Sequence, residues 1–203
     1  MLALSGVLLG AALIGTALSP YLLVKSPLLL VAISAAPHHV ALAAASVEPG
    51  PLIAVATLRR VLTAVGAYGV GYVYGSAVLE WVRGRYPRFG RFIDFVERLF
   101  ARRGVALLAV APAQTLALLA GSARSPFLPF VLAVMLGHAL WNGLTYYLGD
   151  ALSHLTDRLT AFLGEHLFES TLVCVIAVGA QQASARWLRR SRALAARKEA
   201  DPT

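Results

Sequence analysis

Two pairs of adjacent side chains are the residues in this sequence best suited to chemistry. His38 and His39 follow Pro37 in one apolar stretch, and Arg59 and Arg60 stand together in another. Histidine titrates near physiological pH, so this pair could relay protons or contact an anionic headgroup. Arginine presents a fork of donors that suits a phosphate. A polar interfacial tip for the histidines and simple headgroup anchoring for the arginines are the alternatives.

Further polar residues interrupt other apolar segments. Gln114 and Thr115 follow Pro112, where they could bond a substrate or satisfy the backbone that the proline frees. His138 and Asn142 lie four residues apart and share one helix face. For Asn142 this predicts either a place in a cavity or a hydrogen bond between helices. The candidate substrate-binding residues are His38, His39, Arg59, Arg60, Gln114, Thr115 and Asn142.

No motif predicts an enzyme or a metal centre. The sequence has no Walker-type loop, no HExxH helix and no convincing Ser/His/Asp order. The single cysteine, Cys174, lies in an apolar run, and no carboxylate or cysteine stands near the histidine pair. We therefore expect no catalytic residue, no metal site and no cofactor.

The composition predicts a membrane protein. Hydrophobic residues make up 58% of the 203 residues, charged residues make up 14%, and the mean hydropathy is +0.70. A soluble domain carries about 25% charged residues. Backbone polar groups in lipid must be satisfied within helices or a closed barrel, and the strict alternation of barrel strands is missing. The predicted class is an all-α membrane protein.

The longest apolar segments predict about four membrane crossings, because about 20 residues span the hydrocarbon core. These segments lie at 2–23, 61–82, 126–148 and 160–183. A signal peptide is the alternative for the first, since Ala17, Leu18 and Ser19 loosely resemble a cleavage site. The segment lacks the basic residues that begin a signal peptide, which favours an uncleaved helix.

Two shorter apolar segments, 27–47 and 104–122, are each interrupted by a proline. Pro37 and Pro112 leave halves too short to cross alone, and proline removes a helix donor. We predict two opposed re-entrant helical hairpins; a kinked crossing is the alternative for the first. Broken helices expose unpaired backbone groups, so two of them indicate a central substrate or ion site.

Glycines indicate where helices pack closely. Gly66, Gly71 and Gly75 recur within the second predicted crossing, and Gly121 ends the second hairpin. Small residues at spacings of three to five let neighbouring backbones approach each other. We therefore expect these four glycines to lie at helix–helix contacts.

Basic residues predict the orientation of the chain. The formal charge is +8, and arginines gather at 83–103 and again after residue 185. Apolar residues recur at helical spacing over 88–103, which predicts a basic amphipathic helix on the membrane surface. Such clusters beside apolar segments report topology and anionic lipids rather than nucleic acid. With both clusters in the cytoplasm, the polar loop 150–158 lies outside and both termini lie inside.

Several short motifs follow one another between residues 27 and 150. They are Gly66-Ala67-Tyr68, Tyr72-Val73-Tyr74-Gly75, Phe100-Ala101-Arg102-Arg103-Gly104, the Pro112 break, Leu119-Ala120-Gly121, Phe130, Gly137, Trp141 and Tyr147-Leu148-Gly149. Their order and spacing resemble those of the DedA family, also described as the SNARE-associated or VTT-domain family. The resemblance implies two re-entrant hairpins that face each other from opposite leaflets.

Members of that family are associated with moving or scrambling lipids, including polyprenyl-phosphate carriers, and with proton-dependent envelope homeostasis. The chain departs from the family pattern at the breaks. His38 and His39 stand where an acidic residue is often found, and Ala109 with Gln114 or Thr115 replaces arginines. These departures bear on proton coupling and phosphate recognition, and they leave the expected fold unchanged.

We therefore expect a multi-pass protein of the cell membrane that moves or scrambles lipids through a cavity between the hairpins. Its partners would be membrane lipids with anionic headgroups and no nucleic acid, with a homo-oligomer left open. A non-transporting scaffold for envelope homeostasis and a proton-coupled small-solute transporter are the alternatives. The expected parts are an N-terminal transmembrane helix (1–26), a DedA-like core (27–150), a C-terminal transmembrane helix (151–184) and a basic cytoplasmic tail (185–203).

Overall fold

The computed structural model describes residues 2–85 and 106–200, and every regular element in these ranges is a helix. The helices are α1 (Leu2–Ala17), α2 (Ser19–Lys25), α3 (Pro27–Ile33), α4 (Pro37–Ala43), α5 (Pro49–Arg85), α7 (Gln114–Ser122), α8 (Phe127–Ala151), α9 (Ser153–Glu165) and α10 (Leu167–Ala200). Residues 106–110 are also helical. The predicted all-α class is confirmed for the described chain, whereas the predicted surface helix at 88–103 lies outside it.

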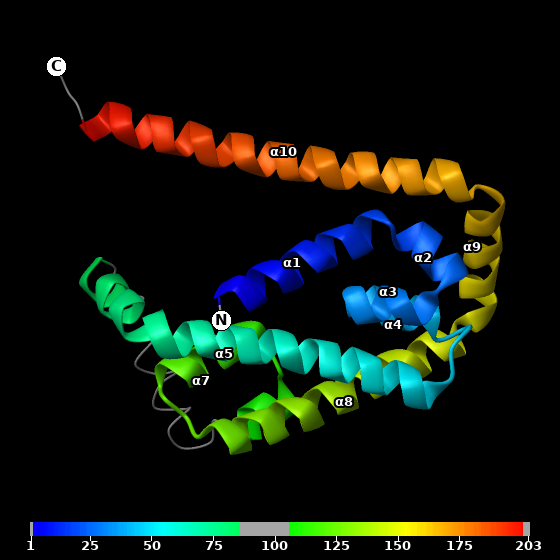
Figure 1. The fold of residues 1–203 in the computed structure, drawn as a ribbon, viewed down its shortest axis with the longest axis horizontal. Coiled ribbons are helices and arrows are strands. Elements are labelled where there is room, and N and C mark those ends of the chain that lie inside the picture. Colours follow the sequence, from blue (N-terminus) through cyan, green and yellow to red (C-terminus); the bar gives the residue numbers. More distant parts are fainter. Residues whose placement is uncertain (1, 86–105, 201–203) are drawn as a thin grey trace.

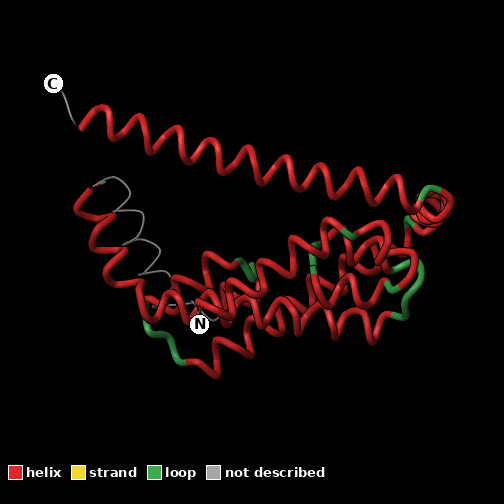
Figure 2. Tube along the Cα trace, turned by 45° about the horizontal axis from the view of Figure 1, so that its top comes forward, coloured by secondary structure: helices red, strands yellow, loops and turns green. Residues whose placement is uncertain are grey.

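The long helices run in one general direction. Figure 1 shows α5 and α8 side by side, α10 along one edge of the molecule and α9 crossing one end. The short helices α3 and α4 lie between α2 and α5, and α7 packs on α5. In Figure 2 the loops that break this pattern are short. The arrangement is one helical bundle with interrupted helices near its middle.

Three helical stretches are long and apolar enough to cross a bilayer. They are Pro49–Gly75 within α5, Phe127–Ala151 in α8 and Leu167–Ala185 within α10. A fourth candidate is the pair Gly6–Ala17 and Ser19–Lys25, whose two halves are bent by 79°. The composition and these lengths make the chain a membrane protein by the usual criterion of about 20 apolar residues.

The first predicted crossing, 2–23, is divided into two helices in the structure. The helix ends at Ala17 and a new helix begins at Ser19. Pro20 has no N–H to donate, so it cannot continue the ladder of α1. The Ser19 hydroxyl donates instead to the Thr16 carbonyl at 2.9 Å. The proline thereby divides an apolar run that looks continuous in sequence.

The helix that contains the second predicted crossing, 61–82, begins earlier than residue 61. The helix α5 starts at Pro49, so Arg59 and Arg60 lie well inside a candidate span rather than at its edge. Pro49 and Pro51 both fit the first turn, where the backbone N–H has no helical partner anyway. The two arginines have good helix propensity and do not interrupt the helix.

The predicted loop 150–158 and the predicted crossing 160–183 also differ from the structure. Residues 153–165 form the helix α9, and a break at His166 separates it from α10. Apolar residues recur along α9 at helical spacing, but the charged residues between them favoured a loop in the sequence-based prediction. The apolar stretch of α10 therefore begins at Leu167.

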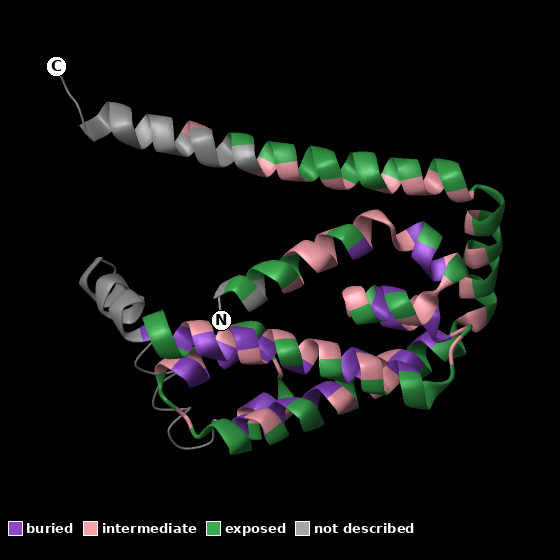
Figure 3. Cartoon of the chain, in the orientation of Figure 1, coloured by how far each residue is buried: buried purple, intermediate pink, exposed green. Residues whose placement is uncertain are grey.

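The buried core lies where α5 meets α7 and α8 (Figure 3). Phe130 is fully buried there beside Tyr68, whose hydroxyl donates to the Ser125 carbonyl at 2.6 Å. A second cluster joins α3, α4 and α5 to Tyr146 of α8. The apolar stretch of α10 contributes nothing to this core, because none of it is buried within the protein.

Glycines permit the close contact of α5 with α7. A Cβ atom at Gly71 would collide with the Leu118 carbonyl, and one at Gly121 would collide with the Tyr68 carbonyl. Gly75 lies in the same way against Ser122. Gly66 is also buried. Three of the four predicted packing glycines thus line one helix crossing.

We predict that Gly71→Ala destabilises the protein by about 1–3 kcal/mol, since the added methyl group must push two backbones apart. Gly179→Ala is the matched control, because no atom lies within 4 Å of a Cβ built there. Thermal unfolding in detergent should show a lower midpoint for Gly71→Ala alone. Alanine is the better helix former, so equal losses in both variants would contradict the assigned contact.

Candidate functional site

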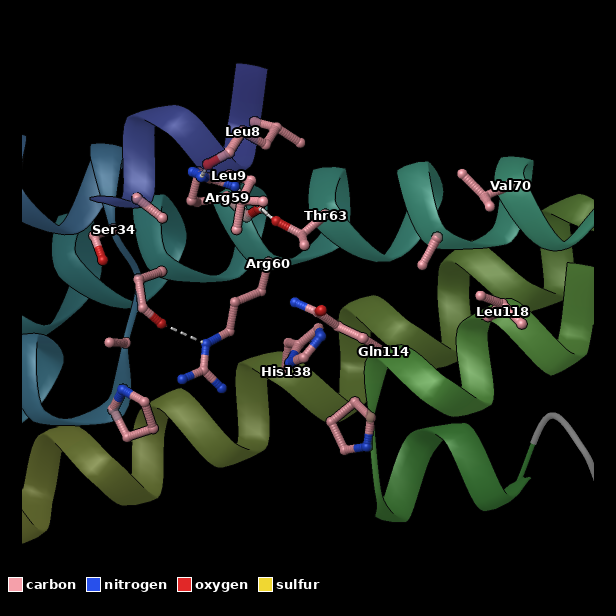
Figure 4. A pocket seen from close by; sticks show the side chains of 16 residues that line it. Leu8, Leu9, Ser34, Arg59, Arg60, Thr63, Val70, Gln114, Leu118 and His138 are labelled. Carbon is pink, nitrogen blue, oxygen red and sulfur yellow. Dashed lines mark hydrogen bonds between the residues drawn. The ribbon is translucent and has the colours of Figure 1, made fainter. Parts of the chain in front are cut away.

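A cavity of about 640 Å³ lies between the two broken helices (Figure 4). Its walls come from α1, from the break between α3 and α4, from α5, from the break before α7, and from α7 and α8. The lining residues are Leu8, Leu9, Ala12, Ser34, Ala35, Ala36, Pro37, Arg59, Arg60, Thr63, Ala67, Val70, Pro112, Gln114, Leu118 and His138. Both prolines that were predicted to interrupt apolar segments therefore border one cavity.

The first break leaves several backbone carbonyls without a helical partner, among them those of residues 33, 34 and 35. The helix α3 ends at Ile33, and Ala36 is extended at φ −68° and ψ 147° because it precedes Pro37. The carbonyls of residues 33, 34 and 35 thus lie between two helices, where α4 offers them no ladder partner. A buried carbonyl without a donor costs free energy, so side chains must reach these oxygens.

Three side chains satisfy those carbonyls. Arg59 Nε donates to Ile33 O at 3.2 Å, and Arg60 Nε donates to Ala35 O at 2.8 Å. His39 Nδ1 lies 2.9 Å from Ser34 O, and since a carbonyl only accepts, the His39 tautomer carries its proton on Nδ1. The arginines of α5 and the histidine of α4 therefore hold the break in place.

The second break is satisfied by a neutral donor. Trp141 Nε1 of α8 donates to Val110 O at 2.8 Å, where the helical residues 106–110 end. Gly137, one turn earlier on α8, lets the carbonyls of Leu108 and Ala109 approach to 2.7 Å from the position of its missing Cβ. The helix α8 thus anchors the second break as α5 anchors the first.

Arg59 has a structural role. Its Nη1 donates to Thr63 Oγ1 at 2.6 Å and its Nη2 donates to Leu8 O at 2.8 Å, in addition to the bond from Nε. All three nitrogens are therefore engaged with protein atoms. The side chain clamps α1 and the end of α3 onto α5, and it has little capacity left for a ligand.

Arg60 is placed differently. Within the described residues, its two terminal nitrogens have no hydrogen-bond partner, and no carboxylate lines the cavity. Figure 4 shows its guanidinium inside the cavity, on the side where His138 and Gln114 lie. A guanidinium in this position presents two donors to a bound acceptor, which suits a carboxylate or phosphate.

His138 contributes a second polar group to the cavity. The residue is only 6% exposed, and its Nδ1 is buried with no hydrogen-bond partner among the described residues. A buried polar atom left unpaired costs about 1–3 kcal/mol, which a water molecule or a ligand can relieve. Gln114, from the first turn of α7, reaches the same space with an amide that both donates and accepts.

The structure brings Arg59, Arg60 and Gln114 together at the cavity, as the sequence suggested, along with Pro37 and Pro112. The other candidates do not line it. His39 lies behind its wall, His38 is exposed and packs edge-on against His39 at 4.2 Å, Thr115 is exposed, and Asn142 is fully buried. Asn142 Nδ2 donates to Thr57 Oγ1 at 3.1 Å between α8 and α5, the alternative expected of it.

His138 lines the cavity, although the sequence did not place it among the candidate binding residues. Its spacing from Asn142 placed both on one face of α8, but the pattern could not say which end of that face meets the cavity. The signal was present in the chain: His138 follows Gly137, and that glycine brings α8 against the second break.

The arrangement is suited to hold an anion. A cationic fork, an unpaired imidazole nitrogen and an amide border a cavity otherwise lined by apolar side chains. In the described part of the chain, no group of three metal-ligating side chains exists that could hold a metal ion.

We predict that Arg59→Ala lowers the free energy of unfolding by about 1–3 kcal/mol, because the carbonyl of Ile33 loses its donor. Arg158→Ala is the control, since that side chain is exposed on α9 and surface substitutions stay within about 0.5 kcal/mol. Thermal unfolding in detergent measures both variants. Equal midpoints for Arg59→Ala and wild type would refute the clamp.

The chain was compared with protein-family models, with curated proteins and with solved structures, and none of them matches it. The DedA resemblance therefore rests on the sequence motifs alone.

Proposed function

We propose that this protein moves or scrambles lipids, and that an anionic headgroup passes through the cavity between the two broken helices. The observation that carries the proposal is Arg60, whose terminal nitrogens face a cavity bordered by both breaks and by no carboxylate among the described residues. The guanidinium fork would bind the headgroup phosphate, with Gln114 and His138 as further partners.

The lining of the cavity favours an amphiphilic molecule over a small polar solute. Leu8, Leu9, Val70 and Leu118 line the same space as Arg60. A molecule with one anionic group on an apolar chain satisfies both kinds of wall, because its chain removes apolar surface from water while its phosphate pairs with the arginine. Membrane lipids with anionic headgroups have this chemistry.

The depth of Arg60 supports a role in crossing the membrane. The residue lies inside the candidate span Pro49–Gly75. Charged side chains within a bilayer are costly, and those that persist face cavities and mark substrate pathways. A phosphate that leaves water needs donors that replace its hydration, and among the described residues the two terminal nitrogens of Arg60 have no other partner.

The finer topology is part of the proposal. If the bent pair α1 and α2 counts as one crossing, four crossings place both termini on the same side. The basic segments near 83–103 and after residue 185 then lie in the cytoplasm of a cell membrane. The two breaks become re-entrant hairpins that meet at the cavity from opposite sides, as the DedA resemblance implies.

We predict that reconstituted wild-type protein exchanges fluorescent phosphatidylglycerol between leaflets faster than empty vesicles do, as measured by dithionite quenching. Arg60→Gln should slow the protein-dependent rate by about tenfold or more, since a hydrogen bond to a charged group contributes about 1.5–3 kcal/mol. Arg60→Lys keeps the charge without the fork and should fall between the two. Arg158→Gln should match wild type.

Two outcomes would overturn the proposal. If phosphatidylglycerol, phosphatidylcholine and a polyprenyl phosphate all exchange no faster than in empty vesicles, then the protein does not move lipids. Wild-type exchange rates in Arg60→Gln, with phosphatidylglycerol as the probe, would show that the headgroup does not bind Arg60 on its way through the protein. Each variant must first elute as a monodisperse species in detergent.

A further inference from the structure

The helix α9 crosses the end of the bundle between two candidate membrane spans. It joins the end of α8 to the start of α10, and Figure 1 shows it running across the direction of both. The start of α5 lies at the same end of the molecule. If α8 and α10 cross a bilayer, then α9 lies where the chain leaves the membrane and turns back into it.

The surface of α9 is divided into three faces. Thr156, Thr160 and Leu163 are half-buried, and Leu163 packs against the cluster around Leu22 and Leu30. A second face carries exposed apolar side chains: Leu155, Leu159 and Phe162 are 60%, 43% and 57% exposed. A third carries exposed polar side chains, His154, Asp157, Arg158 and Glu165.

The order of these three faces around the helix shows how α9 can lie on the bundle. At about 100° per residue, the exposed apolar stripe of Leu155, Leu159 and Phe162 spans about 60°. The charged residues Arg158 and Glu165 lie on the side away from the packed face, and Asp157 lies nearly opposite the apolar stripe. The helix therefore packs sideways on the bundle, with the apolar stripe beside the packed face, Arg158 and Glu165 along the other edge of the stripe, and Asp157 nearly opposite it.

We propose that α9 lies in the boundary between lipid headgroups and acyl chains, with Leu155, Leu159 and Phe162 inserted among the chains. An amphipathic helix parallel to the membrane plane buries its apolar stripe in this way. The lipid surface is the occupant that the fold favours, because the chain enters and leaves α9 from two candidate spans and because Asp157 lies nearly opposite the stripe.

The charge of α9 indicates which lipids it can bind. Its polar face carries Asp157 and Glu165 against Arg158, so it offers no excess of positive charge to anionic lipids. The same end of the bundle also carries Glu48, Asp150 and Glu169. Insertion of α9 thus depends on apolar burial and not on headgroup charge, and this end is the outer one by the distribution of charge.

Site-directed spin labelling of the full chain in liposomes tests the assignment. The native cysteine is first changed by Cys174→Ser, and single cysteines then replace Leu155, Leu159 and Phe162, with His154, Asp157 and Ala161 as matched controls. All six side chains are exposed, so a label does not disturb the core. Collision rates with oxygen and with a water-soluble nickel chelate report the surroundings of each label.

Labels at the three apolar positions should collide more with oxygen than with the nickel chelate, and the three controls should show the reverse. The pattern should be the same in pure phosphatidylcholine and with added phosphatidylglycerol. Nickel-dominated collisions at all six positions would place α9 in water and overturn the proposal. An apolar stripe immobilised and shielded from both reagents would also overturn it, since a second protein copy would then cover the stripe. Neither result depends on whether the protein moves lipids.

Discussion

Three consecutive backbone carbonyls, those of Ile33, Ser34 and Ala35, constrain the middle of this protein. The break before Pro37 removes their helical partners, and lipid offers no hydrogen bond in exchange. Arg59, His39 and Arg60 each donate one hydrogen bond to one of these oxygens. Two arginines inside an apolar helix, which look out of place as a sequence, are thereby required by the broken helix beside them.

The same requirement creates the cavity and its charge. Arg59 has little capacity left for a ligand, because its two terminal nitrogens donate to Leu8 of α1 and to Thr63. Arg60 uses one nitrogen on Ala35 and keeps two for the cavity. At the second break an indole, Trp141, supplies the donor, so no further charge enters. Among the described residues, a structural demand at one break therefore leaves the terminal nitrogens of Arg60 without a partner in a largely apolar cavity, and these nitrogens can bind an anion.

Much of this could be predicted from the sequence, and what failed did so for definite physical reasons. Apolar runs and prolines indicated an all-helical membrane protein with breaks at Pro37 and Pro112, and chemistry singled out Arg59, Arg60 and Gln114. The bend before Ser19 was missed because Pro20 stands in a run whose composition is otherwise uniform. The sequence predicts a loop over the first half of α9, because the charges there mask the helical period. His138 and Asn142 share a face, and only the packing of α8 decides that one reaches the cavity and the other bonds Thr57.

The hydrogen bonds at the first break join side chains on one side to main-chain atoms on the other. Any amino acid at positions 33 to 35 supplies the same carbonyl oxygen, whereas only a suitable donor can stand at 39, 59 and 60. The acceptor positions 33 to 35 therefore tolerate substitution much better than the donor positions 39, 59 and 60. In a lineage of such chains, the acceptor segment could change its side chains while the donors stay fixed, and no pair of positions would be seen to change together.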